Sequence, residues 1–248
     1  MLNTRMKDEN TSWQQWYEEN PRPRKKALVK LTYGIGNNDL PYVVKFINKE
    51  TKPWVEVYYC KFYATWERML RRAYQKGWST RHPSYAEVSV CAEWLYSSVF
   101  ADWMSGQISK EGSEVLHLDK DILLPGNKEY SPETCVFVPQ FLNKSLNICE
   151  QLSGDLLKGV RSSTLKDGET RYSWQVKATS GKPGKGGLTC KWEAHKEWQL
   201  ARASVIEQAV EKYKLMDCYR EDVAYAVKAR ADKLRYDAKF GLETTRLP

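Results

Sequence analysis

The chain has 248 residues, of which 28% are charged and 42% hydrophobic, and it carries a net charge of +8. This composition is typical of a globular protein and excludes a largely disordered one. No apolar run is long enough to span a bilayer, and residues 1–20 contain no apolar segment typical of a secretory signal. We therefore expect a cytoplasmic protein that is long enough for two small domains with separate cores.

The charge and the cysteines limit the classes of partner and cofactor. A pI near 9.0 favours nucleic acid, because a positive surface raises the local concentration of polyanions and speeds their association. The six cysteines include no CxxC pair, which favours reduced and buried thiols. An alternative is a structural zinc ion held by Cys60, Cys91 and Cys135.

Residues 1–52 are expected to form a basic N-terminal extension. The run RPRKK at residues 22–26 is either a DNA-contacting arm or a solvated loop held open by its prolines.

Residues 55–104 are expected to hold a strand at 55–60, a helix, a short strand at 88–91 and a second helix. Apolar residues at helical spacing predict the first helix; they are Phe62, Trp66, Met69, Leu70 and Ala73. Arginines at positions 68, 71 and 72 lie on its other side, either contacting phosphate or forming an ordinary solvent-exposed face. The second helix is amphipathic and carries Trp94, Phe100 and Trp103.

Residues 115–147 read VLHLDKDILLPGNKEYSPETCVFVPQFLNKSLN. Two apolar runs, 115–118 and 135–138, flank a polar loop rich in turn-forming residues, which predicts a hairpin with a long connection. A helix that begins near Pro139 would bring Asn143 one turn from its start.

This order of strand, loop, strand and helix is the one that a ββα-metal nuclease needs. Phosphodiester hydrolysis requires a base that activates water and a divalent cation that stabilises the leaving oxygen. The hairpin offers His117, Asp119 and Asp121, and the helix offers Asn143.

Several ordered motifs carry a resemblance to a known family. They are CKFYATWERMLRRAY at residues 60–74, VSVCAEW at 88–94, LDKDIL at 118–123 and YSPETC at 130–135, followed by an asparagine. Together they cover about residues 34–147 and resemble phage-encoded HNH homing endonucleases.

The resemblance implies roles for individual residues. Asp119 and Asn143 would hold a divalent metal ion, and Mg²⁺ suits such oxygen ligands. Lys120 stands where the family has its water-activating histidine, and a lysine is a poor base while it is charged. His117 or Asp121 could replace that histidine. The alternative is structural: the two aspartates cap turns or pair with lysines, His117 is an ordinary strand histidine, and Asn143 caps a turn.

A second resemblance covers residues 156–210, with the segments LLKGVRSS, RYSWQVKA and EAHKEWQLA. These are similar to the apetala-two DNA-binding domain, in which a three-stranded antiparallel sheet packs on one helix. Such a sheet enters the major groove. The matching positions, with the lysines of the last turn, are Arg161, Arg171, Trp174, Lys177, Lys182 and Lys185. The alternative is an exposed basic sheet. The helix should span about 192–214, with Glu193 and His195 used for packing.

The expected fold is therefore α+β, with an HNH-like ββα-metal domain followed by a three-stranded antiparallel sheet packed on a long helix. The expected divisions are an extension at 1–52, the HNH-like domain at 53–152, the apetala-two-like domain at 153–215, and a C-terminal helix and tail at 216–248. The expected activity is metal-dependent nicking or cleavage of double-stranded DNA. The alternatives are a catalytically inactive DNA-binding phage regulator or host-takeover factor, and an interaction protein whose tryptophans bind a host protein.

Overall fold

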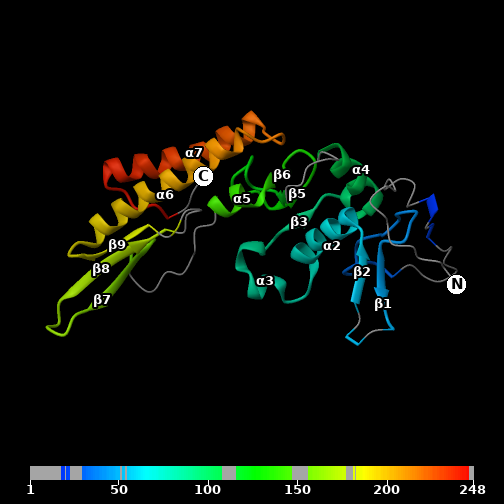
Figure 1. Ribbon diagram of the computed structural model, residues 1–248, viewed down its shortest axis with the longest axis horizontal. Coiled ribbons are helices and arrows are strands. Elements are labelled where there is room, and N and C mark those ends of the chain that lie inside the picture. Colours follow the sequence, from blue (N-terminus) through cyan, green and yellow to red (C-terminus); the bar gives the residue numbers. More distant parts are fainter. Residues whose placement is uncertain are drawn as a thin grey trace. The chain divides into compact units, whose positions relative to one another are not determined.

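The computed structural model describes residues 18–19, 21–22, 30–50, 52–53, 55–107, 116–146, 156–176, 181 and 183–245. The chain forms two compact units, shown with their elements in Figure 1. The first comprises Met1–Ser109 and Asn127–Thr134, and the second comprises Lys110–Gly126 and Cys135–Pro248. The divisions expected from the sequence, with boundaries after residues 52, 152 and 215, stay predictions. Among the described residues, no helix is both long and apolar enough to cross a membrane.

The first unit begins with an antiparallel hairpin followed by an amphipathic helix. Strands β1 (Lys45–Asn48) and β2 (Val55–Tyr59) pair with each other, and α2 (Lys61–Tyr74) follows directly. The helix buries Trp66, Met69 and Leu70, as the spacing of its apolar residues predicts. The strand β1 was not predicted from the sequence.

The rest of the first unit consists of short elements around the same core. They are α3 (Trp78–Arg81), η1 (Pro83–Tyr85), β3 (Ser89–Val90), η2 (Glu93–Leu95), α4 (Ser97–Gln107) and β5 (Glu129–Tyr130). The buried indole of Trp66 donates a hydrogen bond of 2.7 Å to the carbonyl oxygen of Trp94. Trp94 in turn packs edge-on against Phe100, with ring centroids 5.1 Å apart. Strand β5 pairs in parallel with β3, so the connection of the predicted hairpin contributes to this unit.

The second unit contains the predicted strand–strand–helix element. Strand β4 (Leu116–Asp119) pairs antiparallel with β6 (Val136–Pro139), and α5 (Gln140–Leu146) follows without a loop. All four residues of β6 are buried, whereas β4 has one buried residue, Leu118. A strand that is buried on both faces is expected to be apolar throughout, as β6 is.

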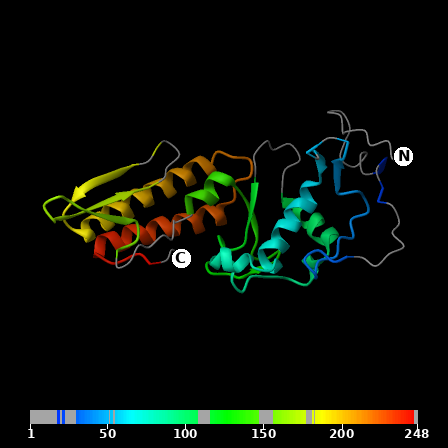
Figure 2. The same ribbon diagram turned by 90° about the horizontal axis from the view of Figure 1, so that it is seen from below.

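A three-stranded antiparallel sheet packs against a long helix in the same unit. The sheet has the order β7 (Val160–Thr164), β8 (Thr170–Gln175) and β9 (Gly184–Leu188), and the helix is α6 (Lys191–Tyr213). A second long helix, α7 (Glu221–Phe240), runs beside α6 in both views of the ribbon (Figures 1 and 2). The α+β class and the sheet packed on a helix are thus confirmed.

One apolar core joins these elements. Val138 of β6, Leu142 of α5 and Trp198 of α6 belong to the same buried cluster as Val227 and Leu234 of α7. The aromatic face of the sheet, Tyr172 and Trp174, packs on the adjoining side of α6. The strand–strand–helix element and the three-stranded sheet are therefore parts of a single folded unit.

A buried histidine connects α6 to the segments on either side of it. His195 is 1% exposed. Its Nδ1 donates to the carbonyl oxygen of Lys158 at 2.8 Å, and its Nε2 accepts from the backbone N–H of Thr244 at 3.1 Å and from the amide of Gln199 at 3.0 Å. These contacts fix a neutral tautomer, and burial lowers the pKa of His195. The prediction that His195 is a packing residue is confirmed.

Candidate functional site

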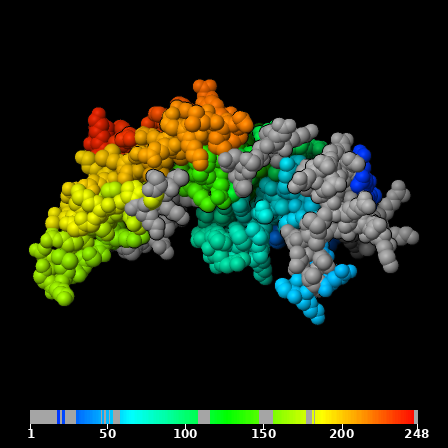
Figure 3. Space-filling view, viewed as in Figure 1, coloured from blue at the N-terminus to red at the C-terminus, as the bar shows by residue number. Residues whose placement is uncertain are grey.

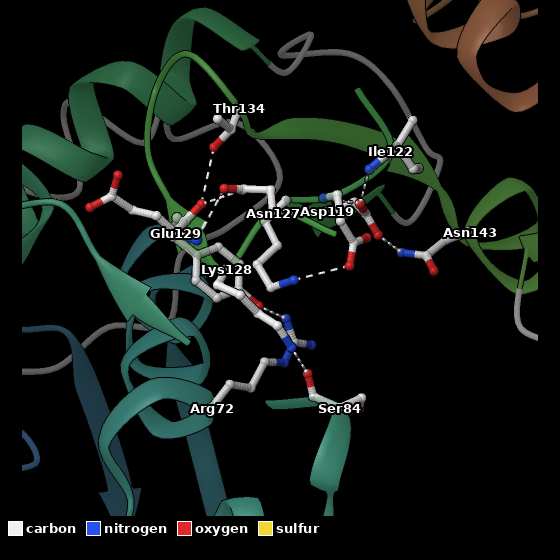
Figure 4. Close-up of polar contacts among 12 residues, drawn as sticks. Arg72, Ser84, Asp119, Ile122, Asn127, Lys128, Glu129, Thr134 and Asn143 are labelled. Atoms are coloured by element: carbon white, nitrogen blue, oxygen red, sulfur yellow. Dashed lines mark hydrogen bonds and ion pairs between the residues drawn. The ribbon is translucent and has the colours of Figure 1, made fainter. Parts of the chain in front are cut away.

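Two side chains of β4 face two side chains of α5. His117 and Asp119 are two residues apart on the strand and share one face, and Gln140 and Asn143 are three apart on the helix and share one side. The amide nitrogen of Gln140 lies 3.3 Å from Nε2 of His117. The amide nitrogen of Asn143 donates to Oδ2 of Asp119 at 3.1 Å across 24 residues of sequence, as Figure 4 shows. The structure therefore brings His117, Asp119 and Asn143 together and adds Gln140 to them.

Asp119 accepts three hydrogen bonds. Its Oδ1 accepts the backbone N–H groups of Asp121 and Ile122, both at 2.9 Å, and its Oδ2 accepts the Asn143 amide. Burial and the nearby charge of Asp121 raise the pKa of Asp119 to about 6. A cation bound beside this carboxylate would favour its ionised form.

Lys120 is turned into the protein. The residue is 6% exposed, and its ammonium group lies 3.0 Å from Oδ2 of Asp121. Asp121 itself is more open, with 49% of its side chain exposed. The lysine thus neutralises one of the two carboxylates of this loop.

Two buried arginines from the long helices hold both parts of the site. Arg230 of α7 donates to the carbonyl oxygens of Asp121 at 2.9 Å and Ile122 at 3.0 Å, directly after β4. Arg202 of α6 donates to the carbonyl oxygen of Ser145 at 2.6 Å, in the last turn of α5. Burial lowers the pKa of both guanidinium groups. The loop that carries the aspartates and the helix that carries Asn143 are therefore both anchored to the α6–α7 pair.

The donors of this site suit a hard cation with few protein ligands. Asp119 and Asn143 offer a carboxylate and an amide oxygen, and Mg²⁺ is commonly held by one or two carboxylates with water and substrate phosphate. Rotating the Asn143 amide by 180° would turn its oxygen toward Asp119 in place of its nitrogen, and the two orientations fit the same outline. Among the described residues there is no group of three or more His, Cys, Asp or Glu side chains that could form a closed metal cage.

The predicted DNA-contacting residues fall on two faces of the three-stranded sheet. Arg161 pairs across the sheet with Ser173, and Arg171 pairs with Ser163, on the face opposite α6. Trp174 and Lys185 face α6 instead, where both bind Glu197, at 2.7 Å and 2.6 Å. Arg171 also pairs with Glu169 at 2.5 Å. Lys177 and Lys182 lie outside the described residues.

The described cysteines give no separate site. Cys60 is buried beside Tyr42, with 3.7 Å between its sulfur and the hydroxyl oxygen. Cys135 is buried in the second unit. The zinc site at these positions stays a prediction.

Comparison of the chain with models of protein families, with curated proteins and with solved structures found no match.

Sequence reasoning missed the three residues that organise the site. The sequence contained a signal for Gln140. It stands one helical turn before Asn143, and His117 stands two residues before Asp119, so both pairs share a face of their element. Arg202 and Arg230 had no such signal, since an arginine in an amphipathic helix is normally solvent-exposed.

Proposed function

We propose that this chain binds double-stranded DNA in the host cytoplasm and that its strand–strand–helix element nicks or hydrolyses a phosphodiester bond with the help of a divalent metal ion. The observation that supports this most directly is the contact between Asp119 and Asn143. Together with the order of β4, β6 and α5, it fits the HNH-type ββα element that the sequence resembles.

Each residue of the site has a defined part in this chemistry. Asp119 and Asn143 would hold the metal ion, which when bound stabilises negative charge on the leaving oxygen. His117 is the base that takes a proton from the attacking water. Its Nε2 lies 3.3 Å from the Gln140 amide nitrogen, so the water must replace that amide as the partner of the Nε2 lone pair before the proton is transferred. Lys120 neutralises Asp121, so that a phosphate group meets less repulsion at this loop.

The three-stranded sheet supplies the DNA contacts. Its face opposite α6 carries Arg161 and Arg171 together with small residues, Ser163 and Ser173. Arg171 is paired with Glu169 and would exchange that carboxylate for a phosphate on binding. Small neighbours leave long arginine side chains room to reach phosphates and base edges. Trp174 and Lys185, which face α6, orient the sheet and are not part of the proposed contact surface.

The test is a plasmid-nicking assay with Mg²⁺, Mn²⁺ or EDTA, comparing the wild type with Asp119→Asn. Asparagine retains an oxygen that can accept the two backbone N–H groups, so the loop keeps its turn while the carboxylate is lost. We expect nicking that requires the metal ion and falls by at least about 100-fold in the variant.

Asp232→Asn is the matched control. Asp232 is an exposed aspartate of α7 that pairs with Lys228, so its substitution removes the same charge outside the site. Equal nicking by Asp119→Asn and the wild type would refute the assignment of the site.

A second measurement follows the metal ion without relying on activity. In Asn143→Asp, two carboxylates would face each other, which lowers the melting temperature in EDTA. Mg²⁺ should raise the melting temperature of this variant more than that of the wild type, because the added carboxylate is a further ligand. Equal Mg²⁺ effects would contradict a metal site at this position.

The second candidate function is DNA binding without catalysis. It is favoured by the hydrogen bonding of Asp119, whose two oxygens accept three N–H donors as a turn-capping carboxylate does. In that case the wild type binds duplex DNA and nicks no plasmid with either metal ion. Asp119→Asn then changes the stability of the protein alone.

A further inference from the structure

The first unit carries a surface on which cationic and aromatic side chains are stacked. It follows the C-terminal half of α2 into α3 and η1, a segment that lies on the outside of this unit in Figure 3. The members of this arginine–aromatic surface are Arg71, Arg72, Trp78, Arg81, His82 and Tyr85.

Trp78 is the centre of the stack. The guanidinium carbon of Arg71 lies 4.9 Å from the centre of its ring, and that of Arg81 lies 5.5 Å away. The ring of His82 packs on the indole in a tilted arrangement, with 4.4 Å between centroids. Such cation–π contacts hold the planar guanidinium group in place. The Nε of Arg71 is buried, so a ligand can meet this arginine only at its terminal nitrogens, whereas Arg81 is exposed.

Tyr85 extends the stack to a third arginine. Its ring lies 6.4 Å from that of His82 in an edge-on arrangement, and the guanidinium carbon of Arg72 lies 5.8 Å from the tyrosine ring. Ring contacts thus connect all six side chains in one array.

The turn after α2 builds this surface. The helix ends at Tyr74, and Gly77 has φ of +74°, a left-handed conformation that glycine adopts without strain. The backbone N–H of Trp78 then donates to the carbonyl oxygen of Gln75 at 3.0 Å. This reversal places Trp78 against the last turn of α2, where Arg71 and Arg72 lie.

The surface is strongly positive. Residues 68–86 contain five arginines and lysines and no acidic residue. Within the described part of the chain, neither Arg71 nor Arg81 forms an ion pair with a carboxylate. By contrast, Arg220 and Arg235 of α7 are paired with Asp222 and Glu207.

We propose that the arginine–aromatic surface is a second DNA-contacting surface, which binds phosphates of the duplex backbone independently of sequence. This inference rests on the proposed DNA binding and adds to it, because the site and the sheet described above belong to the other unit. The stacked arginines are held in place before binding, and planar guanidinium groups bind phosphate oxygens in a bidentate manner.

Duplex phosphates fit this surface better than unpaired bases do. A base that stacks on a protein needs a free aromatic face. Here the ring of Trp78 is already contacted by two guanidinium groups and by His82. What the surface offers a ligand is therefore its guanidinium edges and not its rings.

The experiment measures the affinity of the full chain for a fluorescent duplex of about 25 base pairs between about 50 and 250 mM KCl. Arg71→Gln/Arg81→Gln is compared with the wild type and with Arg220→Gln/Arg235→Gln, which removes two neutralised arginines and changes the net charge equally. We expect the first variant to lower the slope of log K against log salt by about 1.8, since each phosphate contact contributes about 0.9. Its affinity at about 0.1 M salt should fall at least tenfold, and the control should stay close to the wild type.

Further arms separate the inference from the proposed function. Arg81→Gln alone changes an exposed residue, whose side chain donates a hydrogen bond to Gly77 of its own turn. This variant should retain the wild-type melting temperature. It should lower the slope of log K against log salt by about 0.9. The inference of a second surface would be wrong if Arg71→Gln/Arg81→Gln gave the same slope as the control variant while Arg161→Gln/Arg171→Gln weakened DNA binding. That result would leave the proposed function standing. Binding of single-stranded oligonucleotides alone would also overturn it, and a wild type that binds no DNA would overturn both.

Discussion

Substitution of Arg230 is the strongest test of how the second unit holds the candidate site in place. Its guanidinium group is buried and donates two hydrogen bonds to the loop after β4, at the carbonyl oxygens of Asp121 and Ile122. A third bond, at 2.7 Å, goes to Ala226 in its own helix. In Arg230→Met the side chain keeps most of its length and loses all donors, so two loop carbonyls are left without the partner they have in the native fold.

The expected magnitude follows from these contacts. A hydrogen bond from a charged group contributes about 1.5–3 kcal/mol, so the two bonds to the loop contribute about 3–6 kcal/mol. Removing a buried cation relieves its desolvation penalty, which offsets roughly 1–2 kcal/mol of that loss. We therefore expect Arg230→Met to lower the free energy of unfolding by about 2–4 kcal/mol.

Urea unfolding at neutral pH measures this change, with Arg235→Met as the control. Arg235 is an exposed arginine of the same helix, paired with Glu207 at 2.6 Å, and its loss should cost less than about 1 kcal/mol. Arg230→Lys should fall between the two, because an ammonium group cannot reproduce the planar fork. A loss below about 0.5 kcal/mol in Arg230→Met would show that the loop is held by other contacts, and the reasoning would be wrong.

Three further predictions concern pH and glycine. Burial lowers the pKa of His195 below its usual 6.5, so this histidine takes up a proton at a higher pH in the unfolded chain than in the folded one. The free energy of unfolding should therefore decrease as the pH falls through about 6.5. This decrease should be absent in His195→Gln. Gly159→Ala should cost about 2–4 kcal/mol in urea unfolding, because φ is +78° and a Cβ would lie 2.3 Å from the ring of Trp198. Gly36→Ala should cost about 1–3 kcal/mol, because a Cβ would lie 2.8 Å from the Trp66 ring.

Two other glycines provide matched controls for these substitutions. A Cβ at Gly186 would lie 3.8 Å from Ser173, and one at Gly106 would have no atom within 4 Å. Alanine at either position should change the free energy of unfolding by less than about 1 kcal/mol. Losses as large as those at the crowded glycines would show that close approach is not the cause. If the free energy of unfolding of His195→Gln still decreased as the pH falls through about 6.5, other titratable groups would be the cause of that decrease.

The local patterns of the sequence were sufficient for most elements and for one contact of the site. The helices α2 and α6 have long apolar faces, and the runs that became β4 and β6 are separated by clear turn residues. The pairing of those strands and the start of α5 just after Pro139 then bring Asn143 to Asp119. Each of these steps depends on residues close together in the chain.

What could not be predicted depends on which residues of two strands pair with each other. Strand β5 has two residues and exists because it pairs with β3, about 40 residues earlier. The face on which Lys185 lies depends on an irregularity in the pairing of β8 with β9, because the step from Tyr172 to Trp174 is matched by the longer step from Leu188 to Lys185. A shift of one residue moves a side chain to the other face of a sheet, so alternation along β9 alone cannot place this lysine.

The shared core of the second unit limits how the proposed function can work. Trp198 packs under the sheet at Gly159 and belongs to the same buried cluster as Leu142 of α5, and Ile122 of the site loop lies in that cluster too. Closely packed cores transmit displacement and do not absorb it. A sheet that reads DNA would therefore hold Asp119 and Asn143 at a fixed distance from the sequence it reads. The proposed enzyme should accordingly nick at one defined position relative to its binding site, and cuts scattered over several base pairs would be inconsistent with this core.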